Sequence, residues 1–186
     1  MALPTSQIDR SWTLFLDRDG VINRHLPNDY VRSIDQFKLL PGVARALAQL
    51  TPRFGRILIV TNQQGVGKGL YTLDDLASIH DYMVALIKGE GGRIDRVYVA
   101  PQLEAENSPM RKPGIGMAQR AKADFPEVDF AKSIMVGDTV GDMIFGRRAG
   151  MYTVLVGGAD QNLFDSGQVD AVFPSLVEVA EEILEG

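Results

Sequence analysis

The chain has 186 residues, of which 24 are acidic and 19 are basic, so its formal net charge is -5 at neutral pH. This length suits a single domain with a sizeable hydrophobic core, and we expect residues 1–186 to form one. The acidic excess is small and no block of like charges occurs, which predicts no nucleic-acid partner. No apolar run is long enough for a membrane helix and the N-terminus does not resemble a signal peptide, so we expect a cytoplasmic monomer without membrane contact.

Cysteine is absent, and the only two histidines are His25 and His80. This composition excludes disulfides and thiolate-bound metals, and two histidines alone do not make a zinc site. Any bound metal must therefore be held mainly by oxygen atoms.

Short apolar runs that are typical of strands alternate with amphipathic stretches that are typical of helices. In chain order we expect strands at 13–16, 56–60, 96–100, 133–136, 153–156 and 170–173, and helices at 42–50, 73–87, 114–123, 142–149 and after residue 175. Capping-box spacing at Thr72 with Asp75, and at Ser175 with Glu178, supports two of the helix starts. The alternation predicts an α/β fold, a Rossmann-like three-layer α/β/α sandwich with a central parallel sheet.

Polar residues follow several of the predicted strands, at the positions where such sheets bind their ligands. They are Asp17 and Asp19 after the first strand, Thr61 and Asn62 after the second, Lys112 in the loop beyond the third, and Asp138 and Asp142 after the fourth. If Asp17, Asp19 and Asp138 converge, two carboxylates about 5 Å apart repel by roughly 3 kcal/mol at an effective dielectric near 20. A hard divalent cation would relieve this repulsion, and Mg²⁺ fits an all-oxygen site.

Mg²⁺ held by carboxylates usually keeps positions for water and for a substrate phosphate. Lys112 could neutralise a phosphate oxygen, and Thr61 could donate a hydrogen bond to another. The combination predicts phosphoryl transfer to a carboxylate nucleophile.

These residues resemble the four motifs of the haloacid dehalogenase superfamily of aspartate-nucleophile phosphatases. The motifs appear in order as DRDGV at 17–21, Thr61, Lys112 and GDTVGD at 137–142. The segments FLDRDGVIN, VTNQQGVGKGLYT and RKPGIGM are similar to the branch that contains heptose 1,7-bisphosphate phosphatases and histidinol-phosphate phosphatases. The resemblance covers roughly residues 13–157.

The resemblance implies a role for each matching residue. Asp17 would attack phosphorus and form an aspartyl phosphate, and Asp19 would protonate the leaving alcohol and then activate water. Mg²⁺ would be held by Asp17, the Asp19 backbone carbonyl and Asp138, with Asp142 supporting it through its water shell. Thr61 and Asn62 would hold phosphate oxygens beside Lys112. General acid catalysis by Asp19 also requires a raised pKa.

The chain departs from this branch at two places. Many relatives bind zinc just before the Arg-Lys-Pro motif, but here the corresponding residues are Ala100, Gln102, Ser108 and Met110, so we predict no zinc. The loop must then be held by packing and hydrogen bonds, or else be mobile. Relatives also often have a lysine where this chain has Thr139.

The spacing of the motifs leaves no room for a separate cap domain. The segment at 24–32 is a candidate specificity loop, and Arg24, Arg32 and Arg111 could bind a second phosphate or another anion. Surface arginines are nevertheless often only solvated.

Two signals are set aside. The segment GVGKG at 65–69 fails the Walker pattern at Asn62 and Gly69, and it fails the dinucleotide pattern at Leu70. His80 lies on the apolar stripe of its helix, which favours packing over a functional role, whereas His25 is equally compatible with a surface position and a substrate contact.

The leading hypothesis is a Mg²⁺-dependent phosphatase of a small metabolite, preferably a sugar phosphate such as D-glycero-D-manno-heptose 1,7-bisphosphate. Alternatives are a histidinol-phosphate phosphatase, which would want acidic or aromatic partners for its substrate, and a non-catalytic module of the same fold. A nucleic-acid 3′-phosphatase has this kind of core too, but no basic stripe supports that activity.

Overall fold

A six-stranded parallel sheet forms the centre of the computed structural model, which describes residues 3–27, 29–158 and 167–186. The strand order is β3-β2-β1-β4-β5-β6, and each neighbouring pair is parallel. The strands are β1 (Thr13–Leu16), β2 (Arg56–Asn62), β3 (Arg96–Ala100), β4 (Ser133–Gly137), β5 (Tyr152–Val156) and β6 (Ala171–Phe173). The chain order reverses direction between β1 and β4, and ligands of open α/β sheets bind at such a switch point.

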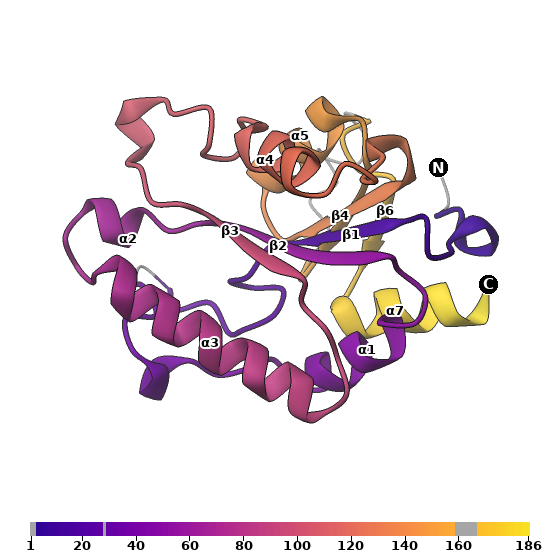
Figure 1. Ribbon diagram of the computed structural model, residues 1–186, viewed down its shortest axis with the longest axis horizontal. Helices are drawn as coiled ribbons and strands as arrows, with labels where there is room; N and C mark the ends of the chain where they lie inside the picture. Colours follow the sequence, from indigo (N-terminus) through magenta and orange to yellow (C-terminus); the bar gives the residue numbers. More distant parts are fainter. Residues whose placement is uncertain (1–2, 28, 159–166) are drawn as a thin grey trace.

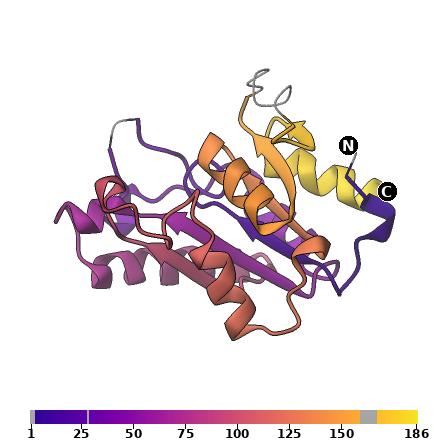
Figure 2. The same ribbon diagram turned by 90° about the horizontal axis from the view of Figure 1, so that it is seen from above.

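Helices cover both faces of this sheet. They are α1 (Val43–Leu50), α2 (Gln64–Gly67), α3 (Leu73–Gly89), α4 (Gly116–Asp124), α5 (Val140–Ala149) and α7 (Leu176–Glu185), with 3₁₀ turns at Thr5–Gln7, Ile34–Gln36, Glu104–Glu106 and Phe130–Lys132. Helices α1, α3 and α7 lie below the sheet in Figure 1, and α4 and α5 lie above it. Figure 2, seen from above, has α4 and α5 in front of the strands. The expected three-layer sandwich is therefore confirmed.

Successive side chains along a strand point to opposite faces of the sheet, so the hydrophobic core has two parts, one on each face. Leu14 and Leu16 of β1 pack with the α1, α3 and α7 side, whereas Phe15 between them packs with α4 and α5. All three side chains are fully buried. A strand covered on both faces needs such a continuous apolar run, which is why β1 was visible in the sequence.

The largest differences from the expected elements lie near the end of β2. This strand continues through Thr61 and Asn62, and the short helix α2 begins at Gln64. We did not expect α2, because two of its four residues, QGVG, are glycines, which disfavour a helix. At the start of α3 the capping box of Thr72 and Asp75 is present as expected. Ser175 caps α7 through the backbone N–H of Val177 rather than that of Glu178.

Within the described residues every strand belongs to this one sheet, and no separate cap domain lies over it. No helix in the described part of the chain is both long and apolar enough to cross a membrane.

Candidate active site

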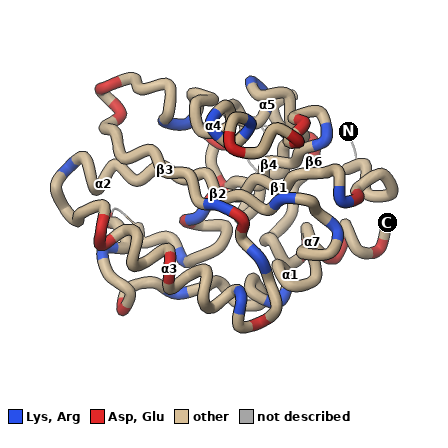
Figure 3. Tube along the Cα trace, viewed as in Figure 1, with Lys and Arg blue, Asp and Glu red and all other residues tan. Residues whose placement is uncertain are grey.

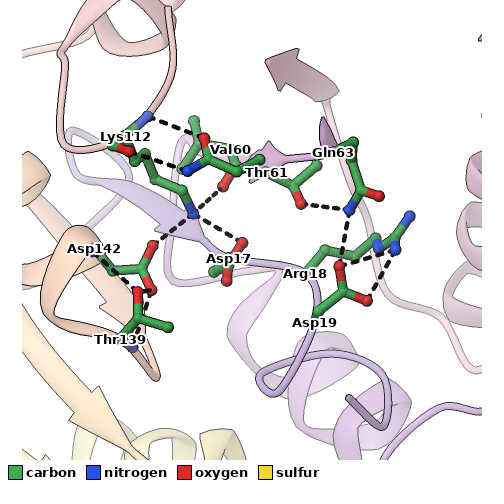
Figure 4. Close-up of polar contacts among 10 residues, drawn as sticks. Asp17, Arg18, Asp19, Val60, Thr61, Gln63, Lys112, Thr139 and Asp142 are labelled. Atoms are coloured by element: carbon green, nitrogen blue, oxygen red, sulfur yellow. Dashed lines mark hydrogen bonds and ion pairs between the residues drawn. The ribbon is translucent and has the colours of Figure 1, made fainter. Parts of the chain in front are cut away.

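Asp17 is the first residue beyond β1, at the switch point of the sheet. Its backbone N–H donates to the carbonyl of Val136 in β4 at 2.9 Å, which fixes its position between the two central strands. Its side chain lines a cavity of about 410 Å³, together with residues that include Asp19, Asn62, Arg111, Lys112, Asp138 and Asp142. Residues far apart in the sequence are thus gathered around one carboxylate (Figure 4).

Lys112 is buried against Asp17 and Asp142. Its Nζ lies 2.8 Å from Asp17 Oδ1 and 2.5 Å from Asp142 Oδ1, and it donates to the carbonyl of Val60 at 2.8 Å. Burial alone would lower the pKa of this ammonium, but the carboxylates of Asp142 and Asp17 outweigh burial and raise the pKa. Lys112 therefore stays charged and offsets one of the negative charges around it.

Three carboxylates meet beside this ammonium. Oxygen atoms of Asp17, Asp138 and Asp142 all lie within 4.8 Å of one another. With Lys112 they have a formal excess of two negative charges, which equals the charge of one divalent cation. Burial raises the pKa of Asp17 to about 7 and that of Asp138 to about 6, because the carboxylates face one another out of bulk water.

Two further observations fit a cation at this cluster. The buried Oδ1 of Asp138 has no hydrogen-bond partner among the described residues. Gly20, whose φ is +85°, leaves the space that the Asp138 carboxylate occupies, because a β-carbon there would lie 1.9 Å from Asp138 Oδ2. A hard cation with oxygen ligands would satisfy this oxygen and the charge excess together.

Asp19 lies in a different polar environment from Asp17. Arg18 donates to both of its carboxylate oxygens, at 2.8 and 2.9 Å, and the side-chain amides of Asn23 and Gln63 donate at 2.9 and 2.8 Å. Burial alone would raise the pKa of Asp19, but the charge of Arg18 and these donors lower it. The raised pKa that acid catalysis by Asp19 would require is not found in this arrangement, because each of these neighbours is a donor that favours the ionised carboxylate.

The two polar residues at the end of β2, Thr61 and Asn62, have different hydrogen-bond partners. The hydroxyl of Thr61 accepts a hydrogen bond from Gln63 at 2.9 Å, so its own proton can be donated to a ligand. The side-chain amide of Asn62 instead joins both backbone groups of Lys112, accepting from its N–H at 2.9 Å and donating to its carbonyl at 3.1 Å. The side-chain amide of Asn62 thus holds the loop that carries Lys112, and a contact of Asn62 with a phosphate oxygen stays a prediction.

The loop between β3 and α4, for which the sequence predicts no zinc, is held by hydrogen bonds and apolar contacts. Besides the Asn62 clamp, the N–H of Gly116 donates to the Pro109 carbonyl at 2.8 Å and that of Gly114 to the Arg111 carbonyl at 2.7 Å. Met110 packs on the core cluster beneath α4. These contacts are the kind of support that the absence of cysteine requires.

The candidate anion-binding arginines are placed differently from one another. Arg111 lines the cavity, and its buried Nη1 has no hydrogen-bond partner among the described residues. Arg24 is exposed and is not among the residues that line the cavity, and the exposed Arg32 pairs with Asp29. His25 does line it. Asn28, within the candidate specificity loop, lies outside the described residues.

Sequence reasoning missed two side chains that organise the site. Gln63 donates to both Asp19 and Thr61. Thr139 caps α5 in a reciprocal box with Asp142, whose Oδ2 accepts from the hydroxyl of Thr139 at 2.6 Å and from its N–H at 3.1 Å. The three-residue spacing of Thr139 and Asp142 is a capping-box signal that was available in the sequence.

Comparison with known proteins shows the family of this chain. A family model described as "Polynucleotide kinase 3 phosphatase" matches residues 13–179. The D-glycero-alpha-D-manno-heptose-1,7-bisphosphate 7-phosphatase of Mycobacterium tuberculosis (strain CDC 1551 / Oshkosh) is 39% identical over 174 residues, which cover 91% of this chain and 90% of that protein. The D-glycero-beta-D-manno-heptose-1,7-bisphosphate 7-phosphatase of Rhodopseudomonas palustris is 34% identical over 167 residues, covering 86% and 91%.

A solved structure agrees with these sequence matches. The D,D-heptose 1,7-bisphosphate phosphatase from B. bronchiseptica, complexed with magnesium and phosphate, superposes with a TM-score of 0.84 at 31% identity, covering 94% of this chain and 98% of that one. The fold and the matches define a phosphoric monoester hydrolase of the haloacid dehalogenase type. Within that superfamily, the chain belongs to the polynucleotide kinase 3 phosphatase family. The relatives named above are heptose 1,7-bisphosphate phosphatases.

Proposed function

We propose that this chain is a Mg²⁺-dependent phosphatase that removes one phosphate from a heptose 1,7-bisphosphate. The observation that carries the proposal is the cluster of Asp17, Asp138 and Asp142 around Lys112, because its formal excess of two negative charges suits a divalent cation, to which a phosphate ester can also bind. The names of the relatives supply the substrate class.

In the proposed reaction a carboxylate oxygen of Asp17 attacks phosphorus, and the bond from phosphorus to the sugar oxygen breaks with its electron pair leaving on that oxygen. The negative charge of a bound phosphate would raise the pKa of Asp19, so that Asp19 takes up a proton when the substrate binds and then gives it to the leaving oxygen. Water then attacks the aspartyl phosphate, loses a proton to Asp19 and releases phosphate and the free Asp17 carboxylate. Each turnover therefore returns Asp19 to its starting protonation state.

The surrounding residues would hold the phosphoryl group in place. Thr61 would donate its hydroxyl proton to a phosphate oxygen, and Lys112 would offset charge on Asp17 and on the phosphate. Asp17, the Asp19 backbone carbonyl and Asp138 would hold Mg²⁺, with Asp142 in support, and the bound ion would offset the negative charge that the transferred phosphoryl group carries.

Arg111 is the residue that we assign to the remote phosphate of a bisphosphate substrate. Its buried Nη1 has no hydrogen-bond partner among the described residues, so this nitrogen could donate to a phosphate oxygen. Arg111 also lines a second cavity of about 330 Å³ with Ser108 and Arg148. A guanidinium group can hold a phosphate through two parallel hydrogen bonds. Arg24 is the weaker candidate because it lies outside the cavity lining.

Histidinol phosphate is the second candidate substrate. Asp29, Tyr30 and Glu104 line the cavity, and such residues could bind an amine and an imidazole. Polynucleotide 3′-phosphates rank lower, because the net charge is -5 and Lys and Arg are interspersed with Asp and Glu along the chain trace in Figure 3.

Phosphate release separates these possibilities. The assay would compare both anomers of heptose 1,7-bisphosphate, histidinol phosphate, a simple sugar monophosphate and a 3′-phosphorylated oligonucleotide, each with and without Mg²⁺. We expect the highest kcat/KM for a heptose bisphosphate, dependence on Mg²⁺, and loss of turnover in Asp17→Asn. Absence of phosphate release from every ester, with no Mg²⁺ binding, would leave the non-catalytic module as the surviving hypothesis.

A further inference from the structure

Arg18 is a fully buried charge whose partners connect the active site to helix α3. Its Nη2 donates to both carboxylate oxygens of Asp19, and its Nη1 lies 3.0 Å from Nε2 of His80. Among the described residues, Asp19 is the one carboxylate that forms a salt bridge with Arg18. His80 belongs to α3, 62 positions further along the chain, and its side chain is also buried.

The chemistry of this contact fixes which group donates. A guanidinium group has N–H donors and no acceptor, so Nε2 of His80 must accept the hydrogen bond. Burial, and then the charge of Arg18, lower the pKa of His80 to about 3, so the imidazole is neutral and can accept. The proton of the neutral ring is then on Nδ1.

Stability alone does not account for such an arrangement. A buried ion pair is often no more stabilising than apolar residues of the same volume, because both charges lose their hydration. The arrangement does fix the orientation of the Asp19 carboxylate, which accepts hydrogen bonds from Arg18 and from Gln63. Gln63 is held in turn, because its side-chain oxygen accepts from the Tyr71 hydroxyl at 2.7 Å. In Figure 4, Arg18 and Gln63 flank Asp19 on the side away from Lys112 and Asp142.

We infer that His80 is a positioning residue for the phosphatase reaction: by anchoring the guanidinium of Arg18, it sets the direction in which the Asp19 carboxylate faces the cavity. His80 does not line that cavity and is not part of the carboxylate cluster. Its influence on the chemistry passes through Arg18. The inference rests on the proposed role of Asp19 as the group that protonates the leaving oxygen.

Two matched variants isolate the acceptor atom of His80. His80→Gln keeps a side-chain acceptor, whereas His80→Met has a similar length and helix propensity but replaces that acceptor with a weakly accepting thioether. Methionine is also the easier of the two to bury without a partner. His80→Met also leaves a buried N–H of Arg18 without its acceptor, so thermal melting of both proteins must show that each is folded at the assay temperature.

The leaving group provides a readout that a purely structural role would not move. An alkyl phosphate, such as a sugar phosphate, needs its leaving oxygen protonated, whereas p-nitrophenyl phosphate needs little help because its leaving group is a stable anion. We expect kcat/KM of His80→Met to fall about tenfold for the alkyl phosphate, which is about 1.4 kcal/mol in barrier, and less than about twofold for p-nitrophenyl phosphate. His80→Gln should stay close to the parent for both, and all should bind Mg²⁺ equally.

Asp19→Asn is measured alongside, and should show the same contrast between substrates in a stronger form. If kcat/KM of Asp19→Asn falls equally for both substrates, its proposed acid role fails and the inference about His80 fails with it. If Asp19→Asn discriminates and His80→Met does not, the proposed function stands and the inference about His80 alone is overturned. Equal losses in His80→Met and His80→Gln would also overturn it, because the acceptor atom would then not be the cause.

Discussion

The ammonium of Lys112 lies 2.8 Å from a carboxylate oxygen of Asp17, at the end of the central strand β1. The two residues come from segments far apart in the sequence, and Asn62 holds the Lys112 backbone in place from the end of β2. Because this contact is buried, it sets both the charge of the site and part of the stability of the fold.

Replacing Lys112 with Met should therefore strengthen Mg²⁺ binding but lower kcat. Without the ammonium, the carboxylates of Asp17, Asp138 and Asp142 have three negative charges, so we expect tighter Mg²⁺ binding by calorimetry. The metal-free protein should lose about 3 to 5 kcal/mol of stability, as when one partner of a buried ion pair is removed. We expect kcat to fall by roughly a hundredfold or more, since the charge on the phosphoryl group is no longer offset. Weaker Mg²⁺ binding would contradict this charge accounting.

Mg²⁺ should stabilise the protein more at pH 7.5 than at pH 5. The pKa of Asp138 is raised from 3.8 to about 6, so the folded protein holds an extra proton between these values. The stabilising contribution of that proton is complete below pH 4 and is lost as the pH rises through 6, and burial acts on Asp17 in the same direction. A cation binds the ionised carboxylates, so its stabilising effect should grow over the same interval.

Differential scanning fluorimetry with and without Mg²⁺ at the two pH values measures this effect. Asp138→Asn serves as the comparison, and its gain in Tm from Mg²⁺ should be small at both pH values. An equal gain for the parent at pH 5 and pH 7.5 would show that the cluster does not exchange protons for the cation.

Asn62→Ala should loosen the loop that carries Lys112. The substitution removes two hydrogen bonds to the Lys112 backbone, so amide hydrogen exchange should become faster at residues 108–114. We expect kcat to fall by about tenfold while KM changes less than about twofold, because the lysine is misplaced and no substrate contact is lost. A rise in KM with unchanged exchange would indicate that the Asn62 amide binds phosphate after all.

Arg111→Ala should affect a bisphosphate more than a monophosphate. If Arg111 binds the remote phosphate, its removal should raise KM for heptose 1,7-bisphosphate by roughly ten- to a hundredfold, as expected for a charge-assisted contact of about 1.5 to 3 kcal/mol. KM for a sugar monophosphate should change little.

Two further arginines complete this experiment. Arg45→Ala, at an exposed position on α1, removes the same charge away from the cavity and should leave both KM values unchanged. Arg24→Ala tests the other arginine that the sequence nominated. A larger effect at Arg24 than at Arg111 would reverse our assignment.

The sequence predicted the sheet well because each strand contains an apolar run, and β1 and β3 begin and end where expected. It also identified Asp17, Lys112, Asp138 and Asp142, which the structure brings together at one edge of the sheet. The apolar pattern predicted a parallel sheet but not the order of its strands, because periodicity does not indicate which strands are neighbours.

Polar partners were the part that the sequence could not supply. His80 has the apolar neighbours of a packing residue, and nothing local indicates that Arg18 will reach it. The identity of Asn62 as a polar residue does not show whether its side chain binds phosphate or the backbone of Lys112. The lowered pKa of Asp19 likewise depends on Arg18 and on the donors Asn23 and Gln63, whose directions are set only when the chain has folded.

Asp142 illustrates how closely architecture and chemistry are joined in this molecule. One of its oxygens caps α5 through Thr139, and the other contacts the ammonium of Lys112. A substitution at Asp142 would change the start of a helix and the charge of the cavity in one event, so lost activity in such a variant has two separate causes. Thr139→Ala removes the capping hydroxyl and leaves both Asp142 oxygens in the chain, which makes it the reference against which any Asp142 variant should be interpreted.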